Sequence, residues 1–168
     1  MSNVTIPKND AVIVERTFKV GVGLIWQLWT DPDHFKNWYG PKGFTIPVAE
    51  MDLQIGGKRL ICMASPDGGM KMWTVGEYKE IVPNKRLVYT ESPSDENGNP
   101  VSPTAMGMPE GYPATTEIIV VLEDLGGHTK MTMTHAGVPA SSGAGSGWEQ
   151  AFDKLTDYIG KTLKNGTG

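Results

Sequence analysis

The feature that most restricts the fold is a series of four strand-like segments in the first half of the chain. They are separated by short Gly-Gly, Pro-Asp-Gly-Gly and Pro-Asn turns and cover residues 44–55, 58–64, 70–82 and 86–91. Strands that follow one another through such short turns form hairpins, because a parallel connection needs a dozen or more residues. This part of the sequence therefore predicts an antiparallel meander.

Three further strands are expected outside the meander. Residues 11–20 are rich in β-branched and aromatic side chains, and Val12, Val14 and Phe18 fall on one face of the alternation. Residues 115–123 and 129–135 have a similar composition and are joined by a glycine-containing turn. We therefore expect a sheet of about six or seven strands.

Two short helices are expected between the first strand and the meander. Apolar side chains recur with helical spacing over residues 24–29. Asp31 can then cap a second helix, because Pro32 suits a first helical position. This second helix would carry Phe35 and Trp38 and end at a Gly-Pro pair.

The clearest helix lies near the C-terminus, over residues 147–163. Trp148, Phe152, Leu155 and Ile159 form an apolar stripe on one helical face, with charged side chains away from it. A run of strands with helices segregated from them is typical of an α+β fold, in which the helices cover one face of an antiparallel sheet.

The segment 92–113 contains five prolines together with Asp, Asn, Gly and Ser, and it shows no periodicity. We interpret it as one long surface loop. A loop of this length inside a compact domain is often functional, so we expect it to act as a lid over a binding site.

The length of 168 residues fits one domain, which we place at residues 11–164 after a tail of residues 1–10. The tail has no apolar signal region, and no stretch of the chain has the roughly 20 apolar residues that a membrane span needs. Cys62 is the single cysteine, so a disulfide framework is excluded. These features predict a cytoplasmic protein with no membrane span.

The net charge of −4 comes from acidic and basic residues that are mixed along the chain. This pattern argues against a nucleic-acid partner. The 21 glycines and 12 prolines indicate many turns, while nine methionines and five tryptophans would give an interior of large and adaptable side chains.

The sequence contains no convincing catalytic or metal-binding constellation. His34, His128 and His135 lack the four-residue spacing of a helical zinc site. Cys62 has no basic neighbour in sequence, which favours an inert buried thiol over a nucleophile. We therefore predict no catalytic residue, no metal and no cofactor, and favour a non-catalytic protein.

Several ordered motifs in this chain resemble the bacterial homologues of the activator of the ninety-kilodalton heat-shock protein ATPase. The matching stretches are residues 16–18, 22–28, WTDP (29–32), WYGPKGF (38–44), IGG (55–57), GEYKEI (76–81), PNKRLVYT (83–90), GMPEG (107–111), 134–135 and 147–155. Each motif is weak alone, but the ordered set is specific. The chain departs from the family pattern at Val20-Gly21, where Ala-Pro is frequent, and at Gln54, where Arg is frequent.

The resemblance implies a START-like, birch-pollen-allergen-like fold of the helix-grip kind, in which a curved antiparallel sheet wraps around the long C-terminal helix. Members of this superfamily include lipid carriers, hormone receptors and cyclases, so the fold alone does not fix the function. The family name also implies a stress-related, co-chaperone-like role.

We expect the chain to bind a small hydrophobic or amphipathic ligand in a cavity between the sheet and the C-terminal helix. The residues predicted to line this cavity are Trp38, Met63, Met72, Trp73, Tyr78, Tyr89, His135, Trp148 and Phe152. Two alternatives remain open: an interaction module that contacts a chaperone or another protein, and a cyclase or hydrolase that uses a cavity carboxylate or His135. Exposed edge strands are compatible with a monomer or a homodimer.

Overall fold

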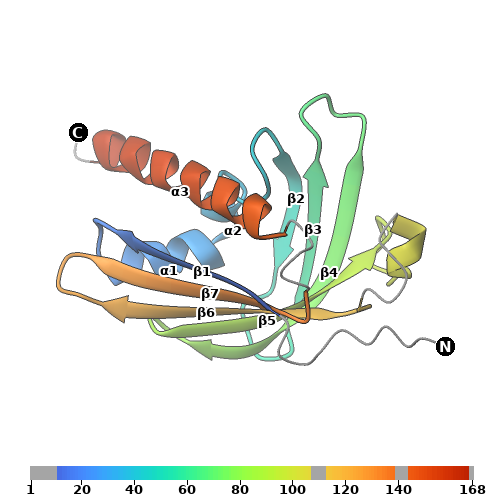
Figure 1. The fold of residues 1–168 in the computed structure, drawn as a ribbon, viewed down its shortest axis with the longest axis horizontal. Helices are drawn as coiled ribbons and strands as arrows, with labels where there is room; N and C mark the ends of the chain where they lie inside the picture. Colours follow the sequence, from blue (N-terminus) through green and yellow to red (C-terminus); the bar gives the residue numbers. More distant parts are fainter. Residues whose placement is uncertain (1–10, 107–112, 139–143, 167–168) are drawn as a thin grey trace.

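The computed structural model describes residues 11–106, 113–138 and 144–166. Seven antiparallel strands form one sheet in the order β1-β7-β6-β5-β4-β3-β2 (Figure 1). The strands are β1 (Ala11–Phe18), β2 (Thr45–Met51), β3 (Lys58–Ala64), β4 (Lys71–Val82), β5 (Arg86–Ser94), β6 (Thr116–Asp124) and β7 (Thr129–Ala136). The predicted antiparallel meander is confirmed, and β1 extends it by pairing with β7.

The helices lie on one side of this sheet. They are α1 (Val22–Thr30), α2 (Pro32–Phe35) and α3 (Ala144–Gly166), and the 3-10 turn η1 (Pro103–Met106) follows β5. Figure 1 shows α3 crossing above β1 and β7 while β2, β3 and β4 rise beside its N-terminal end. The curved sheet and the long C-terminal helix confirm the α+β helix-grip fold.

The apolar stripe predicted for α3 forms its buried face. Trp148, Phe152, Leu155 and Ile159 are all buried and belong to the main hydrophobic core. Trp29 of α1 packs against this stripe, with its ring centroid 6.1 Å from that of Phe152. Burial of each large apolar side chain stabilises the fold by roughly 1.5–3 kcal/mol, so this stripe holds α3 against the sheet.

The second helix is shorter than the sequence predicted. Asp31 caps it as expected, because its carboxylate accepts a hydrogen bond from the backbone N–H of Asp33 at 2.9 Å. The helix ends at Phe35, so Trp38 lies beyond it. Trp38 is nevertheless fully buried, because its indole Nε1 donates to the carbonyl oxygen of Leu28 at 2.8 Å.

The prediction of one loop over residues 92–113 was wrong at its start. β5 continues to Ser94, and Ser92 pairs with Val75 of β4. The residues that follow fold back over the outer face of the sheet, where Gly98 lies close to the side chains of Leu60 and Val75. Pro93 concealed this extension, because proline is unusual inside a strand. Residues 107–112 of the predicted loop lie outside the described residues.

A close approach between β4 and β5 requires glycine at position 76. A Cβ atom there would lie 1.8 Å from the carbonyl oxygen of Thr90. The register between the two strands shifts just beyond this point, between Tyr78 and Glu80. This irregularity places Tyr78 opposite Tyr89, and both side chains are fully buried.

Candidate functional site

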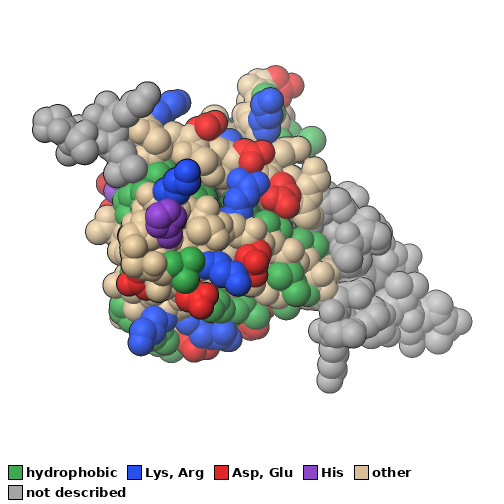
Figure 2. Space-filling view, turned by 60° about the vertical axis from the view of Figure 1, so that its left-hand side comes forward, with side chains coloured by type: hydrophobic (Ala, Val, Ile, Leu, Met, Phe, Trp, Pro, Cys, Tyr) green, Lys and Arg blue, Asp and Glu red, His purple; other side chains and the backbone are tan. Residues whose placement is uncertain are grey.

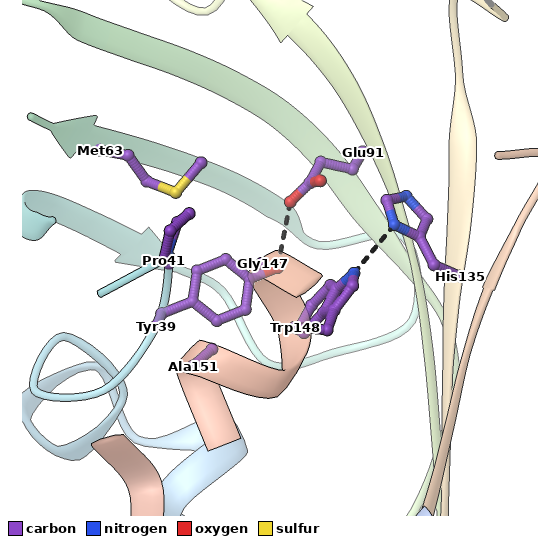
Figure 3. Close-up of a pocket in the computed structure, with 9 residues that line it drawn as sticks. Tyr39, Pro41, Met63, Glu91, His135, Gly147, Trp148 and Ala151 are labelled. Carbon is purple, nitrogen blue, oxygen red and sulfur yellow. Dashed lines mark hydrogen bonds between the residues drawn. The ribbon is translucent and has the colours of Figure 1, made fainter. Parts of the chain in front are cut away.

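A pocket opens beside the N-terminal part of α3, at the point where the sheet curves away from the helix (Figure 3). Its volume is about 180 Å³. The described residues that line it are Tyr39, Gly40, Pro41, Met63, Glu91, His135, Gly147, Trp148 and Ala151. An apolar cavity of about 150 Å³ holds benzene, so this pocket has room for a ligand built around one ring.

The wall formed by residues 39–44 is tied to α3 by one lysine. Lys154 Nζ donates to the backbone carbonyl oxygens of Tyr39, Pro41 and Phe44 at 3.1, 3.1 and 3.2 Å. These contacts use the full donor capacity of an ammonium group. Burial lowers the pKa of Lys154. The lysine therefore fixes the wall and is not available to a ligand.

The same wall needs glycine at position 40. Its backbone φ angle is +88°, a left-handed conformation that side chains rarely adopt. A Cβ atom at this position would also lie 3.0 Å from Met63 Sδ. Gly40 therefore lets the chain turn tightly around the pocket while leaving space for the Met63 side chain.

His135 of β7 joins the pocket to the sheet through a chain of hydrogen bonds. Trp148 Nε1 donates to His135 Nδ1 at 3.1 Å (Figure 3), and His135 Nε2 lies 2.8 Å from Thr116 Oγ1. Because an indole N–H can only donate, Nδ1 must be the acceptor and the proton of the neutral ring must be on Nε2. Thr116 Oγ1 then donates to the backbone oxygen of Glu91 at 3.4 Å.

Burial favours the neutral form of His135. Burial lowers its pKa, although the charge of Glu91 opposes the shift. Both ring nitrogens already have partners within the fold. His135 therefore orients Trp148 at the pocket, and its proton is not free to be exchanged with a ligand unless that arrangement breaks.

Glu91 of β5 receives a second chain of hydrogen bonds at its side chain. Tyr39 Oη donates to Glu91 Oε2 at 3.1 Å, and Tyr39 Oη lies 2.8 Å from Tyr89 Oη. Since the Tyr39 proton points to the carboxylate, Tyr89 must be the donor to Tyr39. Burial raises the pKa of both phenols, so both remain protonated. We call Tyr39, Glu91, Thr116, His135 and Trp148 the pocket cluster.

A buried arginine packs against Tyr89, the tyrosine that is hydrogen-bonded to Tyr39. The guanidinium carbon of Arg59 is 3.5 Å from the ring centroid of Tyr89, with the rings of Phe35 and Tyr78 at 5.4 and 5.6 Å. Arg59 is only 2% exposed, and its Nε and Nη2 atoms have no hydrogen-bond partner in the described part of the chain. We call these four residues the arginine cluster.

The nine residues predicted to line a cavity lie in three places. Met63, His135 and Trp148 line the pocket. Trp38, Tyr78, Tyr89 and Phe152 are fully buried in the core. Met72 and Trp73 are half-buried on adjacent positions of β4, so their side chains point to opposite faces of the sheet. Trp73 pairs with Cys62, on the face away from Met63.

Sequence reasoning missed Tyr39, Glu91 and Arg59. Tyr39 and Gly40 lie in the WYGPKGF motif, which was noted only for its resemblance to a family. Arg59 had a weak signal, since it occupies the same strand face as Ile61 and Met63. Glu91 had none, because a carboxylate at the end of a strand segment is ordinarily solvated.

The other candidate groups show no sign of reactivity. His34 Nδ1 lies 2.8 Å from Tyr158 Oη, and His128 is exposed. Cys62 is buried, and burial raises the pKa of its thiol. Among residues 11–106, 113–138 and 144–166, no three His, Cys, Asp or Glu side chains are grouped in a way that suits a metal ion.

The surface has the mixed charge expected from the sequence. Figure 2 shows Lys, Arg, Asp and Glu side chains interspersed over the face that it presents. None of the helices in the described part of the chain has the length and apolar content needed to span a bilayer.

Comparisons with known proteins agree on one family and one fold. The model of the family described as Activator of Hsp90 ATPase homolog 1-like protein matches residues 19–160. No curated protein matches the chain.

Several solved structures share the fold. A protein from Nitrosomonas europaea is 22% identical, with 95% of this chain and 99% of that chain covered and a TM-score of 0.74. A protein from Arthrobacter aurescens is 23% identical, with coverages of 95% and 93% and a TM-score of 0.75. The AHSA1 protein from Silicibacter pomeroyi is 18% identical, with coverages of 89% and 97% and a TM-score of 0.68. At these identities, the likeness establishes the fold alone.

Proposed function

The chain belongs to the family of Activator of Hsp90 ATPase homolog 1-like proteins, and we propose that it binds a small hydrophobic or amphipathic molecule in the pocket beside α3. The family and the fold indicate a ligand-binding or interaction module. The observation that favours ligand binding is the pocket itself, whose apolar lining is combined with a few fixed polar groups. Concave sites of this composition are the usual sites for small ligands.

The rigidity of the pocket wall supports this proposal. Lys154 ties residues 39–44 to α3, and the hydrogen bonds of His135 fix the ring of Trp148. A site whose side chains are already ordered loses little entropy when a ligand enters. The wall therefore suits a ligand that fits a preformed space.

The size of the pocket limits the ligand. A volume of about 180 Å³ is below the range of roughly 300–1,000 Å³ that is usual for drug-sized ligands. We therefore propose a ligand with one ring or a short branched chain. A long-chain lipid would not fit within this volume.

A variant that fills the pocket tests the proposal directly. Ala151 lines the pocket and is buried, so Ala151→Leu would occupy the space that a ligand needs. Ala105 is exposed, which makes Ala105→Leu a matched control. We expect toluene, measured by isothermal titration calorimetry, to bind the wild type and Ala105→Leu equally and to bind Ala151→Leu at least tenfold more weakly.

The result that would overturn the proposal is a wild-type protein that binds neither toluene nor anisole. Native mass spectrometry of protein purified from its own host provides a second test. A defined small mass that is released on denaturation would support ligand binding and give the ligand's mass. An empty protein that also fails to bind these two probes would favour the interaction-module alternative.

A further inference from the structure

Glu91 carries the only ionised side chain among the described residues that line the pocket. The other polar side chains there are the neutral imidazole of His135, the hydroxyl of Tyr39 and the indole N–H of Trp148. His135 and Trp148 are hydrogen-bonded to each other, and Tyr39 donates to Glu91. The carboxylate is therefore the polar group to which a ligand can bind.

The carboxylate retains acceptor capacity. An ionised carboxylate can accept at about four positions, and the Tyr39 hydroxyl occupies one of them. In Figure 3 the Glu91 carboxylate points toward the Tyr39 hydroxyl, and the dashed line marks the hydrogen bond between them. A donor group on a ligand in this pocket would meet a carboxylate that is held in place.

The positive charge of Arg59 partly offsets the negative charge of Glu91. The guanidinium of Arg59 packs on the ring of Tyr89, whose hydroxyl donates to Tyr39, which in turn donates to Glu91. Each hydroxyl dipole in this row points its positive end toward the carboxylate. Arg59 and Glu91 also interact electrostatically without forming an ion pair. The positive charge of Arg59 and the negative charge of Glu91 thus influence each other without direct contact.

This arrangement discriminates among ligands by charge. An anion would approach the carboxylate that lines the pocket, whereas Arg59 packs on the ring of Tyr89 and does not line it, so the exposed negative charge would repel the anion. A cation would be attracted by Glu91, but Arg59 offsets part of this attraction and the cation would lose hydration on entry, so we expect it to bind more weakly than a neutral donor. A neutral donor would keep the full hydrogen bond to a charged acceptor without that cost.

We propose that the ligand is an uncharged, ring-sized molecule that donates a hydrogen bond to Glu91, which makes Glu91 the specificity-determining residue of the pocket. This inference rests on the proposed function. It adds the chemical class of the ligand: a phenol, an indole or a primary amide fits, whereas a carboxylic acid or an amine that is ionised at neutral pH does not.

Four probes of similar size test this inference on the full chain at pH 7. Phenol is neutral and donates a hydrogen bond, anisole is neutral and has no donor, benzoate is an anion and benzylammonium is a cation. We expect phenol to bind about tenfold more tightly than anisole, which is the factor that one hydrogen bond to a charged acceptor supplies. Benzoate and benzylammonium should both bind more weakly than phenol.

The Glu91→Gln variant provides the second measurement. Its amide keeps the shape of the side chain but removes the charge, so the preference for phenol over anisole should fall below about threefold while anisole affinity stays within twofold. Equal binding of phenol and anisole to the wild type would overturn the inference. So would benzoate or benzylammonium binding as tightly as phenol. Each of these outcomes overturns the inference while anisole still binds the protein. If anisole does not bind at all, the proposed function itself fails.

Discussion

The pocket cluster and the arginine cluster meet where Tyr39 is hydrogen-bonded to Tyr89, yet they hold their buried polar groups in opposite ways. In the pocket cluster, both nitrogens of His135 and the hydroxyl of Tyr39 have partners. In the arginine cluster, two nitrogens of Arg59 and the hydroxyl of Tyr78 have none among the described residues. One region satisfies its polar groups with hydrogen bonds, while the other surrounds a charge with aromatic rings.

This difference shows how a buried charge can persist without an ion pair. A guanidinium is weakly hydrated and planar, so it stacks on aromatic faces that an ammonium would use less well. The face of Tyr89 contacts Arg59, and its hydroxyl continues into the row that ends at Glu91. The arginine cluster therefore places a positive charge close to Glu91, while the pocket cluster fixes the side chains that line the pocket.

Removing the arginine should give the largest effect. Arg59→Ala leaves a cavity among three aromatic rings, and we expect the free energy of unfolding to fall by about 3 kcal/mol. Arg59→Met keeps most of the volume and removes the unpartnered charge, so its cost should be under about 1 kcal/mol. Urea unfolding of both variants measures the difference. A Met variant as unstable as the Ala variant would show that the charge itself holds the fold together.

Removal of a single tyrosine hydroxyl should have the second-largest effect, and the loss of stability should differ between the two clusters. Tyr39→Phe deletes a hydroxyl with two partners and should lower the free energy of unfolding by about 2 kcal/mol. Tyr78→Phe deletes a hydroxyl that has no partner in the described residues, so its effect should lie within about 0.5 kcal/mol. Equal losses for the two variants would contradict the difference between the clusters. Thermal and urea unfolding both give the comparison.

The pH dependence of stability should be the smallest of these effects. Burial lowers the pKa of His135 in the folded protein below its ordinary value of 6.5. The unfolded chain then binds the proton more readily, so stability is complete above pH 6.5 and is lost as the pH falls toward the folded-state pKa. The control is the His135→Gln variant, which has no imidazole to protonate. Below pH 6.5, its free energy of unfolding should fall less steeply with decreasing pH than that of the wild type. An unchanged slope in that variant would exclude His135 as its source.

Sequence patterns predicted most helices and strands, because these depend on the spacing of apolar residues and on turn residues that are close together in the chain. The stripe at Trp148, Phe152, Leu155 and Ile159 gave α3, and short turns gave the meander. The errors fall where tertiary contacts override local signals. Pro93 suggested a loop, but pairing with β4 extends the strand through it. Trp38 suggested a longer helix, but a hydrogen bond to Leu28 fixes it outside α2.

The candidate site was less accessible from the sequence. Residue type alone pointed to large aromatic and methionine side chains, and three of the nine predicted residues line the pocket. Alternation along β4 already meant that Met72 and Trp73 could not share a face. Glu91 and Arg59 come together only through the sheet, since they lie on β5 and β3 with β4 between them. No spacing within the sequence could reveal this pair.

The measurement that tests the central claim most directly is an NMR titration that follows the tryptophan indole N–H signals while anisole is added. Trp148 lines the pocket, whereas Trp73 lies on the other face of the sheet and serves as an internal control. The account predicts a saturable shift of the Trp148 signal with little change at Trp73. A Trp148 signal that does not move at saturating anisole, or moves no more than that of Trp73, would contradict ligand binding in this pocket.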